Sequence, residues 1–381
     1  MKSIIWSISV ILFILICGCS SAKSVVRRDT QNSNIAWEAA NLSHFESELE
    51  SLRQANHIPG FSVGVVHEGA LKWHKGFGMK DLESEEVPDE NTVYHIASIT
   101  KTFGALVMMK LVEEGKIKLS DPILTHDIKL PGKWGNSNDI EIEHLLTHTA
   151  RGNTFNGFKP GYNFSYNGDW YHRLGKAFLS ASGKTFGELV LAEVIQPLGM
   201  SNTVPSLYDT LEFSRTGYDM VSFSKQVAKP YDWSKKEIVP VKYNYNFGPA
   251  AGLMSSVADL TKYSNAIDDG KLLEQASWQK MFTPYKTEKG KETLYGLGWF
   301  VHDYHDLEFI WHTGWWTGYS SLFIKVPELD LTFIILANSQ DVSRPFYKFL
   351  SVGSSLHKNL LASDFAKSFI DHFVLEERKN K

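Results

Sequence analysis

Strand-like patterns occur at both ends of this chain, and helical patterns fill its middle. Near the start, residues 61–66 alternate as a strand does, and residues 71–77 are typical of the return strand of a hairpin. Three more strand-like runs, residues 307–311, 319–326 and 331–337, lie in the last third. Segments this far apart share one core most simply by pairing in a single sheet. The sequence therefore predicts an α+β fold, with an antiparallel sheet formed from both chain ends, flanking helices and a mostly helical insertion.

Helical periodicity places the remaining elements. Apolar positions recur at helical spacing over residues 35–55, over residues 103–111 and over residues 356–375. Residues 120–270 mix short helical patterns with turn residues and show no clear strand series. We therefore expect one domain over residues 37–381, with a helical subdomain inserted at about residues 106–250.

Composition excludes several classes of protein. The formal net charge of −4 lacks the basic excess of a nucleic-acid-binding protein. Only two cysteines occur, Cys17 and Cys19, so the rest of the chain has none to form a disulfide. With 43% hydrophobic residues, the chain has enough apolar material for a large core.

The first residues have the pattern of an export signal. Lys2 precedes an apolar run over residues 4–17, which as a helix would measure roughly 21 Å and is short for a ~30 Å hydrocarbon core. Gly18 and Cys19 follow the run, and residues 16–19 resemble a bacterial lipobox with Cys19 as the lipidated residue. We therefore expect a signal peptide over residues 1–19, a tether over residues 20–36, and a lipoprotein anchored to a membrane facing the periplasm or cell exterior. The alternative is a plain signal peptide cleaved a few residues later, giving a secreted periplasmic protein.

Ser98 and Lys101 form an S-x-x-K sequence at the start of a predicted helix. Three residues make nearly one helical turn, so both side chains project from the same face. A serine hydroxyl becomes a good nucleophile when a neighbouring base removes its proton, and a lysine whose pKa is lowered by burial can act as that base. S-x-x-K alone is common by chance, and a surface lysine near a helix start would give the same pattern.

Nine further segments occur in a characteristic order along the chain. They are residues 58–63 (IPGFSV), 76–78 (GFG), 94–101 (YHIASITK), 119–122 (LSDP), 145–149 (LLTHT), 160–161 (PG), 197–200 (PLGM), 251–253 (AGL) and 312–314 (HTG). With these segments the chain resembles the serine β-lactamase and penicillin-binding protein superfamily, in the branch that holds class C β-lactamases, D-aminopeptidases and related esterases; the resemblance extends over roughly residues 42–338. The resemblance implies a β-lactamase/transpeptidase-like fold with Ser98 as nucleophile.

The second catalytic segment of this family is Tyr-x-Asn. By resemblance, Tyr166 is the tyrosine that relays a proton between the nucleophile and the leaving group. The family asparagine is replaced by Gly168, and Asn167 stands in the middle position instead. We expect Asn167 to contact the substrate, but whether it takes over the role of the missing asparagine is open. A register that uses Tyr162 is the alternative.

The third segment is His312-Thr313-Gly314, where β-lactamases of the superfamily usually have Lys-Thr-Gly. A histidine offers a weaker and pH-dependent charge for a substrate carboxylate, because its unperturbed pKa is ~6.5. The resemblance implies a catalytic role for His312, substrate binding by Thr313, Gly314 and Trp315, and oxyanion contacts from the N–H groups of Ser98 and Trp315. The His-x-Gly form is more similar to peptidase and esterase members.

We predict no metal and no cofactor. His144 and His148 have the four-residue spacing of two metal ligands, but no H-E-x-x-H pattern accompanies them, and the family resemblance gives such a histidine a structural role. The sequence contains no glycine-rich phosphate loop and no dinucleotide-binding fingerprint.

The sequence favours a serine hydrolase that forms an acyl-enzyme on Ser98, acting as an esterase or peptidase on small esters or on D-amino-acid and cell-wall-type peptides. β-Lactamase activity is an alternative within the same chemistry. The second hypothesis is a surface lipoprotein that binds penicillin or a peptide without turnover, motivated by the missing asparagine at position 168. A structural protein without a ligand would leave the pairing of Ser98 with Lys101 unexplained.

Overall fold

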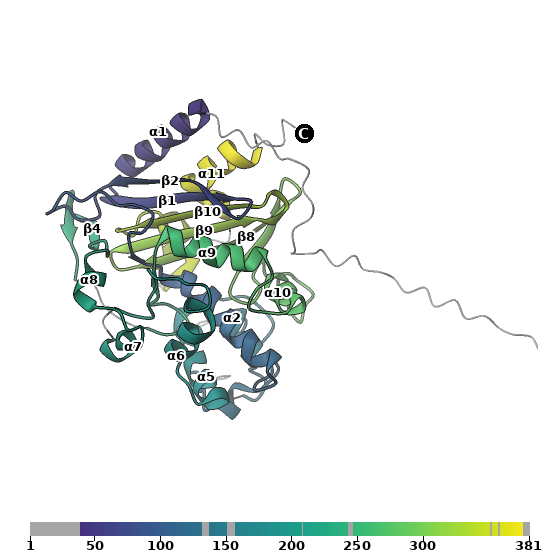
Figure 1. The fold of residues 1–381 in the computed structure, drawn as a ribbon. Helices are drawn as coiled ribbons and strands as arrows, with labels where there is room; N and C mark the ends of the chain where they lie inside the picture. The colour runs from purple at the N-terminus through teal and green to yellow at the C-terminus, as the bar shows by residue number, and fades with distance from the viewer. Residues whose placement is uncertain are drawn as a thin grey trace, which may run out of the picture.

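The sheet predicted from the two chain ends is present in the computed structural model. The strand order is β2-β1-β10-β9-β8-β7, and every neighbouring pair is antiparallel. Figure 1 shows α1 and α11 on one face of this sheet and α2, α5 and α6 beyond the other. The structure describes residues 39–131, 137–150, 157–207, 209–242, 247–350, 353–356 and 359–375.

The strands are β1 (Gly60–His67), β2 (Ala70–Gly78), β3 (Tyr94–His95), β4 (Tyr231–Ser234), β5 (Glu237–Pro240), β6 (Met254–Ser255), β7 (Phe300–Tyr304), β8 (Leu307–Trp316), β9 (Tyr319–Val326), β10 (Leu331–Ala337), β11 (Tyr347–Leu350) and β12 (Gly353–Leu356). The α-helices are α1 (Ala39–Ala55), α2 (Thr100–Glu113), α3 (Ile142–Leu146), α4 (Gly168–His172), α5 (Leu174–Ser182), α6 (Phe186–Val190), α7 (Thr210–Ser214), α8 (Met220–Ser224), α9 (Val257–Asp268), α10 (Gln275–Phe282) and α11 (Asp364–Phe369). Short 3-10 or π turns are η1 (Ala97–Ile99), η2 (Ile123–His126), η3 (Leu191–Ile195), η4 (Pro327–Leu329), η5 (Arg344–Phe346), η6 (Leu360–Ala362) and η7 (Ile370–Leu375).

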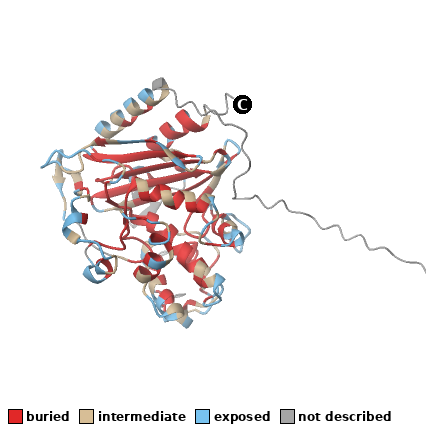
Figure 2. Ribbon diagram, viewed as in Figure 1, coloured by how far each residue is buried: buried red, intermediate tan, exposed pale blue. Residues whose placement is uncertain are grey.

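Pairing of β1 with β10 joins the two chain ends. The register runs from Phe61 opposite Ala337 to His67 opposite Leu331. All eight residues of β1 are buried, since helices cover both faces of the sheet, as the burial colours of Figure 2 show. The predicted fold class is therefore confirmed.

Alternate residues of β10 supply two different cores. Phe333 and Ile335 pack in the core beneath α1 and α11, whereas Ile334 and Leu336 pack in the core shared with α2 and α9. A strand with both faces buried reads as a continuous apolar run, and residues 331–337 do so. Full burial of each such side chain contributes about 1.5–3 kcal/mol relative to exposure.

β8 is longer than β7, the edge strand that pairs with it. β7 pairs with β8 only from Leu307 to Trp311, so among the described residues 312–316 have a neighbouring strand on the β9 side alone. This leaves the backbone of residues 312–316 with an edge next to η1. The predicted third motif therefore lies at an edge of the sheet.

Two expectations about secondary structure were incomplete. The helix expected over residues 356–375 begins only at Asp364 and continues as the π turn η7, whereas Leu356 belongs to β12 and residues 360–362 form η6. Within the region for which no strands were expected, residues 231–240 form the hairpin β4–β5. In its turn Lys235 and Lys236 have φ of 50° and 69°. Glycine or asparagine usually marks such a turn in a sequence, and neither is present here.

In the part of the chain that the structure describes, no helix is both long enough and apolar enough to cross a bilayer. The predicted signal peptide, Cys19 and the tether lie outside the described residues. The expected boundaries of the domain and of the inserted subdomain stay predictions.

Candidate active site

Ser98 lies in η1, immediately before α2, at the junction of the sheet and the helical half. The preceding β3 pairs with β6, and the N–H of Ile96 donates to the carbonyl of Leu253 at 3.0 Å. Ala97 has φ +49°, a strained conformation for an alanine, which local contacts must hold in place. Ser98 is 9% exposed, so its side chain is nearly enclosed yet still reaches the surface.

Lys101 lies one helical turn beyond Ser98, as the spacing predicts. A hydrogen bond of 2.9 Å joins its Nζ to Ser98 Oγ, and a second, of 2.8 Å, joins it to the carbonyl of Ala250. Lys101 is 1% exposed, and no described carboxylate forms an ion pair with it. Burial lowers its pKa to about 7, a change that the more distant Asp169 partly opposes. Lys101 can therefore be neutral, and act as a base, near neutral pH.

Tyr166 lies close to both Lys101 and Ser98. Its ring is 5.0 Å from Lys101 Nζ, and its hydroxyl is buried with no hydrogen-bond partner among the described residues. Burial raises the pKa of Tyr166 well above 10, although the nearby Ser98 side chain opposes the rise. Tyr166 is therefore a neutral phenol beside the Ser98–Lys101 pair, placed where a proton relay would be needed.

Asn167 caps a helix, whereas Gly168 is the residue next to Lys101. The Asn167 side chain caps α4 by accepting the N–H of Trp170 at 3.0 Å. A Cβ atom placed on Gly168 would lie 3.9 Å from Lys101 Nζ, so position 168 is the one beside the lysine. The side chain of Asn167 is thus occupied by the helix, and its role toward a substrate stays a prediction.

His312 is fully buried, and both ring nitrogens have partners. Nδ1 lies 2.7 Å from the carbonyl of Thr313, which can only accept, so Nδ1 carries the proton. Nε2 therefore accepts from the hydroxyl of Tyr295 at 3.0 Å. Burial, together with the nearby charge of Lys101, lowers the pKa of His312 to about 3. The ring is neutral through the physiological range, so it provides no fixed positive charge.

The other residues of the third motif serve contacts within the protein. The Thr313 hydroxyl donates to Ser343 Oγ at 2.8 Å. A Cβ atom on Gly314 would come within 2.4 Å of the Ile96 carbonyl, so this glycine allows β8 to lie against the segment before Ser98. Trp315 packs on Tyr347, with ring centroids 5.1 Å apart. Substrate contacts by Thr313, Gly314 and Trp315 stay predictions.

Several residues of the site escaped the sequence analysis. The carbonyl of Ala250 accepts from Lys101, and the hydroxyl of Tyr295 donates to His312. The hydroxyl of Tyr171 donates to the carbonyl of Lys101 at 2.8 Å. The only signal for Ala250 was its position next to the matching segment at residues 251–253. Tyr171 and Tyr295 had no signal, because buried tyrosines are common in any core.

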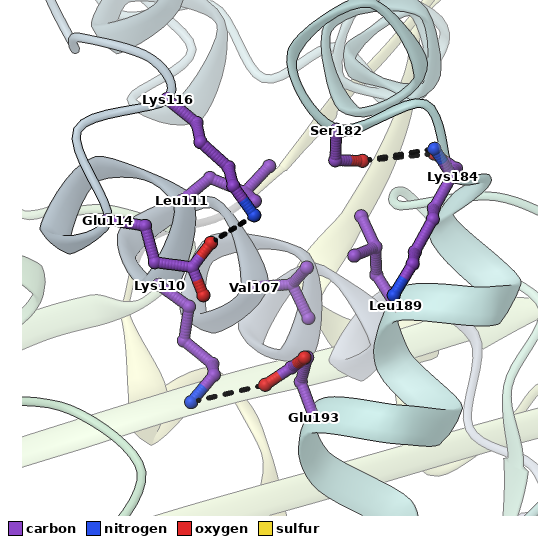
Figure 3. Close-up of a pocket in the computed structure, with 9 residues that line it drawn as sticks. All are labelled: Val107, Lys110, Leu111, Glu114, Lys116, Ser182, Lys184, Leu189 and Glu193. Atoms are coloured by element: carbon purple, nitrogen blue, oxygen red, sulfur yellow. Dashed lines mark hydrogen bonds and ion pairs between the residues drawn. The ribbon is translucent and has the colours of Figure 1, made fainter.

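The rest of the described structure offers no clear second ligand site. No group of three or more His, Cys, Asp or Glu side chains in the described ranges is arranged to hold a metal ion. A small pocket lies between α2 and η3 (Figure 3) and is bordered by ion pairs that include Lys110 with Glu193 at 3.4 Å. Lys110 follows Lys101 by nine positions of helix, about 14 Å along the axis, so this pocket is not part of the site.

Comparison with known proteins gives a consistent result. Residues 45–349 match the family model described as Beta-lactamase. The chain is 26% identical over 322 residues to Protein flp of Staphylococcus aureus (strain NCTC 8325 / PS 47), covering 76% of this chain and 61% of that protein. It is 25% identical over 334 residues to the unguisins hydrolase ungD' of Aspergillus campestris, covering 74% and 59%. The chain therefore spans about three fifths of the length of these curated relatives.

Among solved structures, the chain is similar to the octameric penicillin-binding protein homologue from Pyrococcus abyssi. The TM-score is 0.68 at 27% identity, and the match covers 79% of this chain and 74% of that one. The fold, the order of the motifs and a family match over most of the chain lead to one conclusion. The chain belongs to the Beta-lactamase family, which is the family that its sequence resembles.

Proposed function

We propose that the protein is a serine hydrolase that forms an acyl-enzyme on Ser98. The observation that carries the proposal is the 2.9 Å contact between Ser98 Oγ and the nitrogen of a buried lysine. Among the described residues, this nitrogen is in contact with a hydroxyl and a carbonyl but with no carboxylate. Neutral Lys101 takes the proton of Ser98 as the hydroxyl attacks a carbonyl carbon. Tyr166 passes a proton to the leaving group, and water then hydrolyses the acyl-enzyme with the same groups in reverse.

The oxyanion would be held by the N–H groups of Ser98 and Trp315, by resemblance to the family. Loss of one such donor costs ~3 kcal/mol of transition-state stabilisation in other hydrolases. Gly314 supports this arrangement, since it allows β8 to approach the segment before Ser98. The hydrolase named among the relatives is consistent with the same chemistry.

An esterase or peptidase is favoured over a β-lactamase. A neutral, buried His312 stands where β-lactamases of the superfamily usually have a lysine that attracts the substrate carboxylate. The site therefore lacks that positive charge and has no electrostatic preference for penicillins. We propose small esters or D-amino-acid and cell-wall-type peptides as substrates.

Gly168 supports a second candidate function. Without the family asparagine, and with Asn167 capping α4, the protein would bind penicillin or a peptide without turnover. The two functions differ in the fate of the complex, because a binding protein acylates stoichiometrically without release, or binds reversibly even without Ser98.

The test uses the full-length protein in detergent with a chromogenic short-chain ester and with a penicillin. Turnover and intact mass are recorded for the wild type, for Ser98→Ala and for Ser43→Ala, an exposed serine of α1 as the matched control. We expect ester turnover with a transient adduct on Ser98, absent only in Ser98→Ala. Hydrolysis that survives Ser98→Ala would contradict the hydrolase, and penicillin turnover equal to ester turnover would contradict the preference for esters.

We also propose that the chain is exported and anchored through a lipid on Cys19, with the lipobox pattern at residues 16–19 as support. Metabolic labelling with a radioactive fatty acid, compared between the wild type and Cys19→Ala, tests this. Label that persists in Cys19→Ala would contradict it.

A further inference from the structure

His148 contacts the residues on both sides of Tyr166. Its carbonyl accepts the N–H of Ser165 at 2.8 Å, and its ring Nδ1 accepts the N–H of Asn167 at 3.1 Å. The centroid of the His148 ring is 4.2 Å from that of the Tyr166 ring. One residue thus fixes the backbone before Tyr166, the backbone after it and a face of its ring.

The backbone of His148 is unusual for a histidine. His148 follows the end of α3 with φ +56°, where the N–H of Thr149 donates to the carbonyl of His144 at 2.9 Å. This is a helix-ending motif whose left-handed residue is usually glycine. A glycine would adopt this conformation without strain but would have no ring nitrogen for Asn167. The backbone of His148 is therefore strained at a position where its ring makes a hydrogen bond with the N–H of Asn167.

The ring itself is enclosed by aromatic residues. His148 is 3% exposed, and its ring centroid lies 5.4 Å from that of Tyr171 and 5.1 Å from that of Tyr295. Because Nδ1 accepts, Nε2 carries the proton of the neutral ring, and it has no hydrogen-bond partner among the described residues. Burial and the nearby Lys101 keep the pKa of His148 well below 6.5, so Nδ1 remains an acceptor throughout the physiological range.

We infer that His148 is a positioning residue that holds Tyr166 in place for proton transfer near Ser98. The inference rests on the proposed function, since it assigns a purpose to the position of Tyr166 in that chemistry. His148 does not touch the reacting atoms and acts only through the segment 165–167. Shifts of about 1 Å in a reacting group can change rates 10²-fold, so the constraint is large enough to measure.

The experiment compares His148→Phe with His148→Asn in the full-length protein. Asparagine tolerates the left-handed backbone and places a carbonyl oxygen near the position of Nδ1, whereas phenylalanine keeps a ring without an acceptor. We expect His148→Phe to lower kcat for the ester on the order of 10- to 100-fold with little change in KM, and His148→Asn to recover most of the loss. His148→Gly, which keeps the backbone and removes the acceptor, replaces His148→Phe if that variant fails to fold.

A double-mutant cycle separates positioning from general damage. If His148 acts through Tyr166, His148→Phe costs little additional rate when Tyr166 is already Phe. Equal losses of kcat from His148→Phe in the wild type and in Tyr166→Phe would overturn the inference. It would also be overturned if Tyr166→Phe left kcat unchanged, or if His148→Asn were as slow as His148→Phe. Failure of the proposed function is distinguishable, because the wild type would then form no Ser98 adduct.

Discussion

Two lysines are buried to the same degree in different regions of this molecule. Lys101, in the candidate site, and Lys325, within the sheet on β9, are each 1% exposed. Lys325 Nζ is 2.8 Å from a carboxylate oxygen of Asp268 and donates to the hydroxyls of Ser264 and Thr332 at 2.6 and 3.0 Å. Among the described residues, the hydrogen-bond partners of Lys101 Nζ are one hydroxyl and one carbonyl.

The difference between them is the carboxylate. A buried ammonium that keeps its charge needs a partner of opposite charge, and Lys325 has one. Without such a partner the neutral amine is favoured, which lowers the pKa of Lys101 to about 7. Burial alone therefore does not make a lysine reactive. The neighbours decide whether it is a structural cation or a base.

Replacement of each lysine by methionine should give the largest contrast. We expect Lys101→Met to lower kcat/KM for the ester by on the order of 10³-fold, since it removes the general base. Lys325→Met should leave kcat/KM unchanged, because its partners Ser264 and Asp268 belong to α9 and not to the candidate site. Steady-state kinetics on both variants measure this, and thermal unfolding provides the control. Loss of activity in both variants, with both folded, would remove the distinction.

The ion pair of Lys325 should matter for stability. Asp268→Asn leaves a buried ammonium without its carboxylate, and loss of one partner of a buried pair typically costs about 3–5 kcal/mol in the free energy of unfolding. Lys101→Met removes a buried amine that has no carboxylate partner among the described residues, and it should not lower stability. Denaturant titration of both variants tests this. An Asp268→Asn protein as stable as the wild type would show that the pair is not structural.

A carboxylate introduced beside Lys101 should make it resemble Lys325. In Gly168→Asp the new side chain begins 3.9 Å from Lys101 Nζ and should raise the pKa of the lysine by about one unit or more. Because the neutral amine is the active form, the acidic limb of the pH–rate profile moves upward and activity at pH 7 falls. Gly168→Asn is the matched uncharged control and should leave the limb in place. An aspartate at the start of α4 also suits the helix dipole, so folding should be retained.

The smallest expected effect comes from Asp169. Its charge raises the pKa of Lys101 from a distance, and it is exposed to solvent. In Asp169→Asn the acidic limb should therefore move downward by only about a few tenths of a pH unit, because water and salt screen an exposed charge. Profiles at low and high salt measure the shift. An upward movement would contradict the assigned sign.

The sequence predicted those features of the fold and of the site that depend on residues close together in the chain. The apolar run at residues 331–337 and the alternation at residues 61–66 indicated the strands that join the chain ends. The spacing of Ser98 and Lys101 predicted their contact, because one helical turn leaves little freedom. These features depend on a few neighbouring residues, and periodicity records them well.

Features that depend on distant segments were not predictable. The carbonyl of Ala250 reaches Lys101 across 149 positions in the sequence, and Tyr295 holds His312 through a hydroxyl that no motif marks. The expected charge on His312 also depended on burial, which left it neutral instead of pH-dependent near neutrality. In each case tertiary packing set the environment of a residue that the sequence had already singled out.

In the proposed chemistry, Lys101, neutral near pH 7, activates Ser98. Its most direct test is the rate of Ser98 acylation by a chromogenic ester, followed by rapid quench and intact mass between about pH 5 and pH 9. We expect a rate that rises through an apparent pKa near 7 and then levels, with the limb displaced upward in Gly168→Asp. A rate independent of pH over this range, or a limb that Gly168→Asp leaves in place, would contradict it.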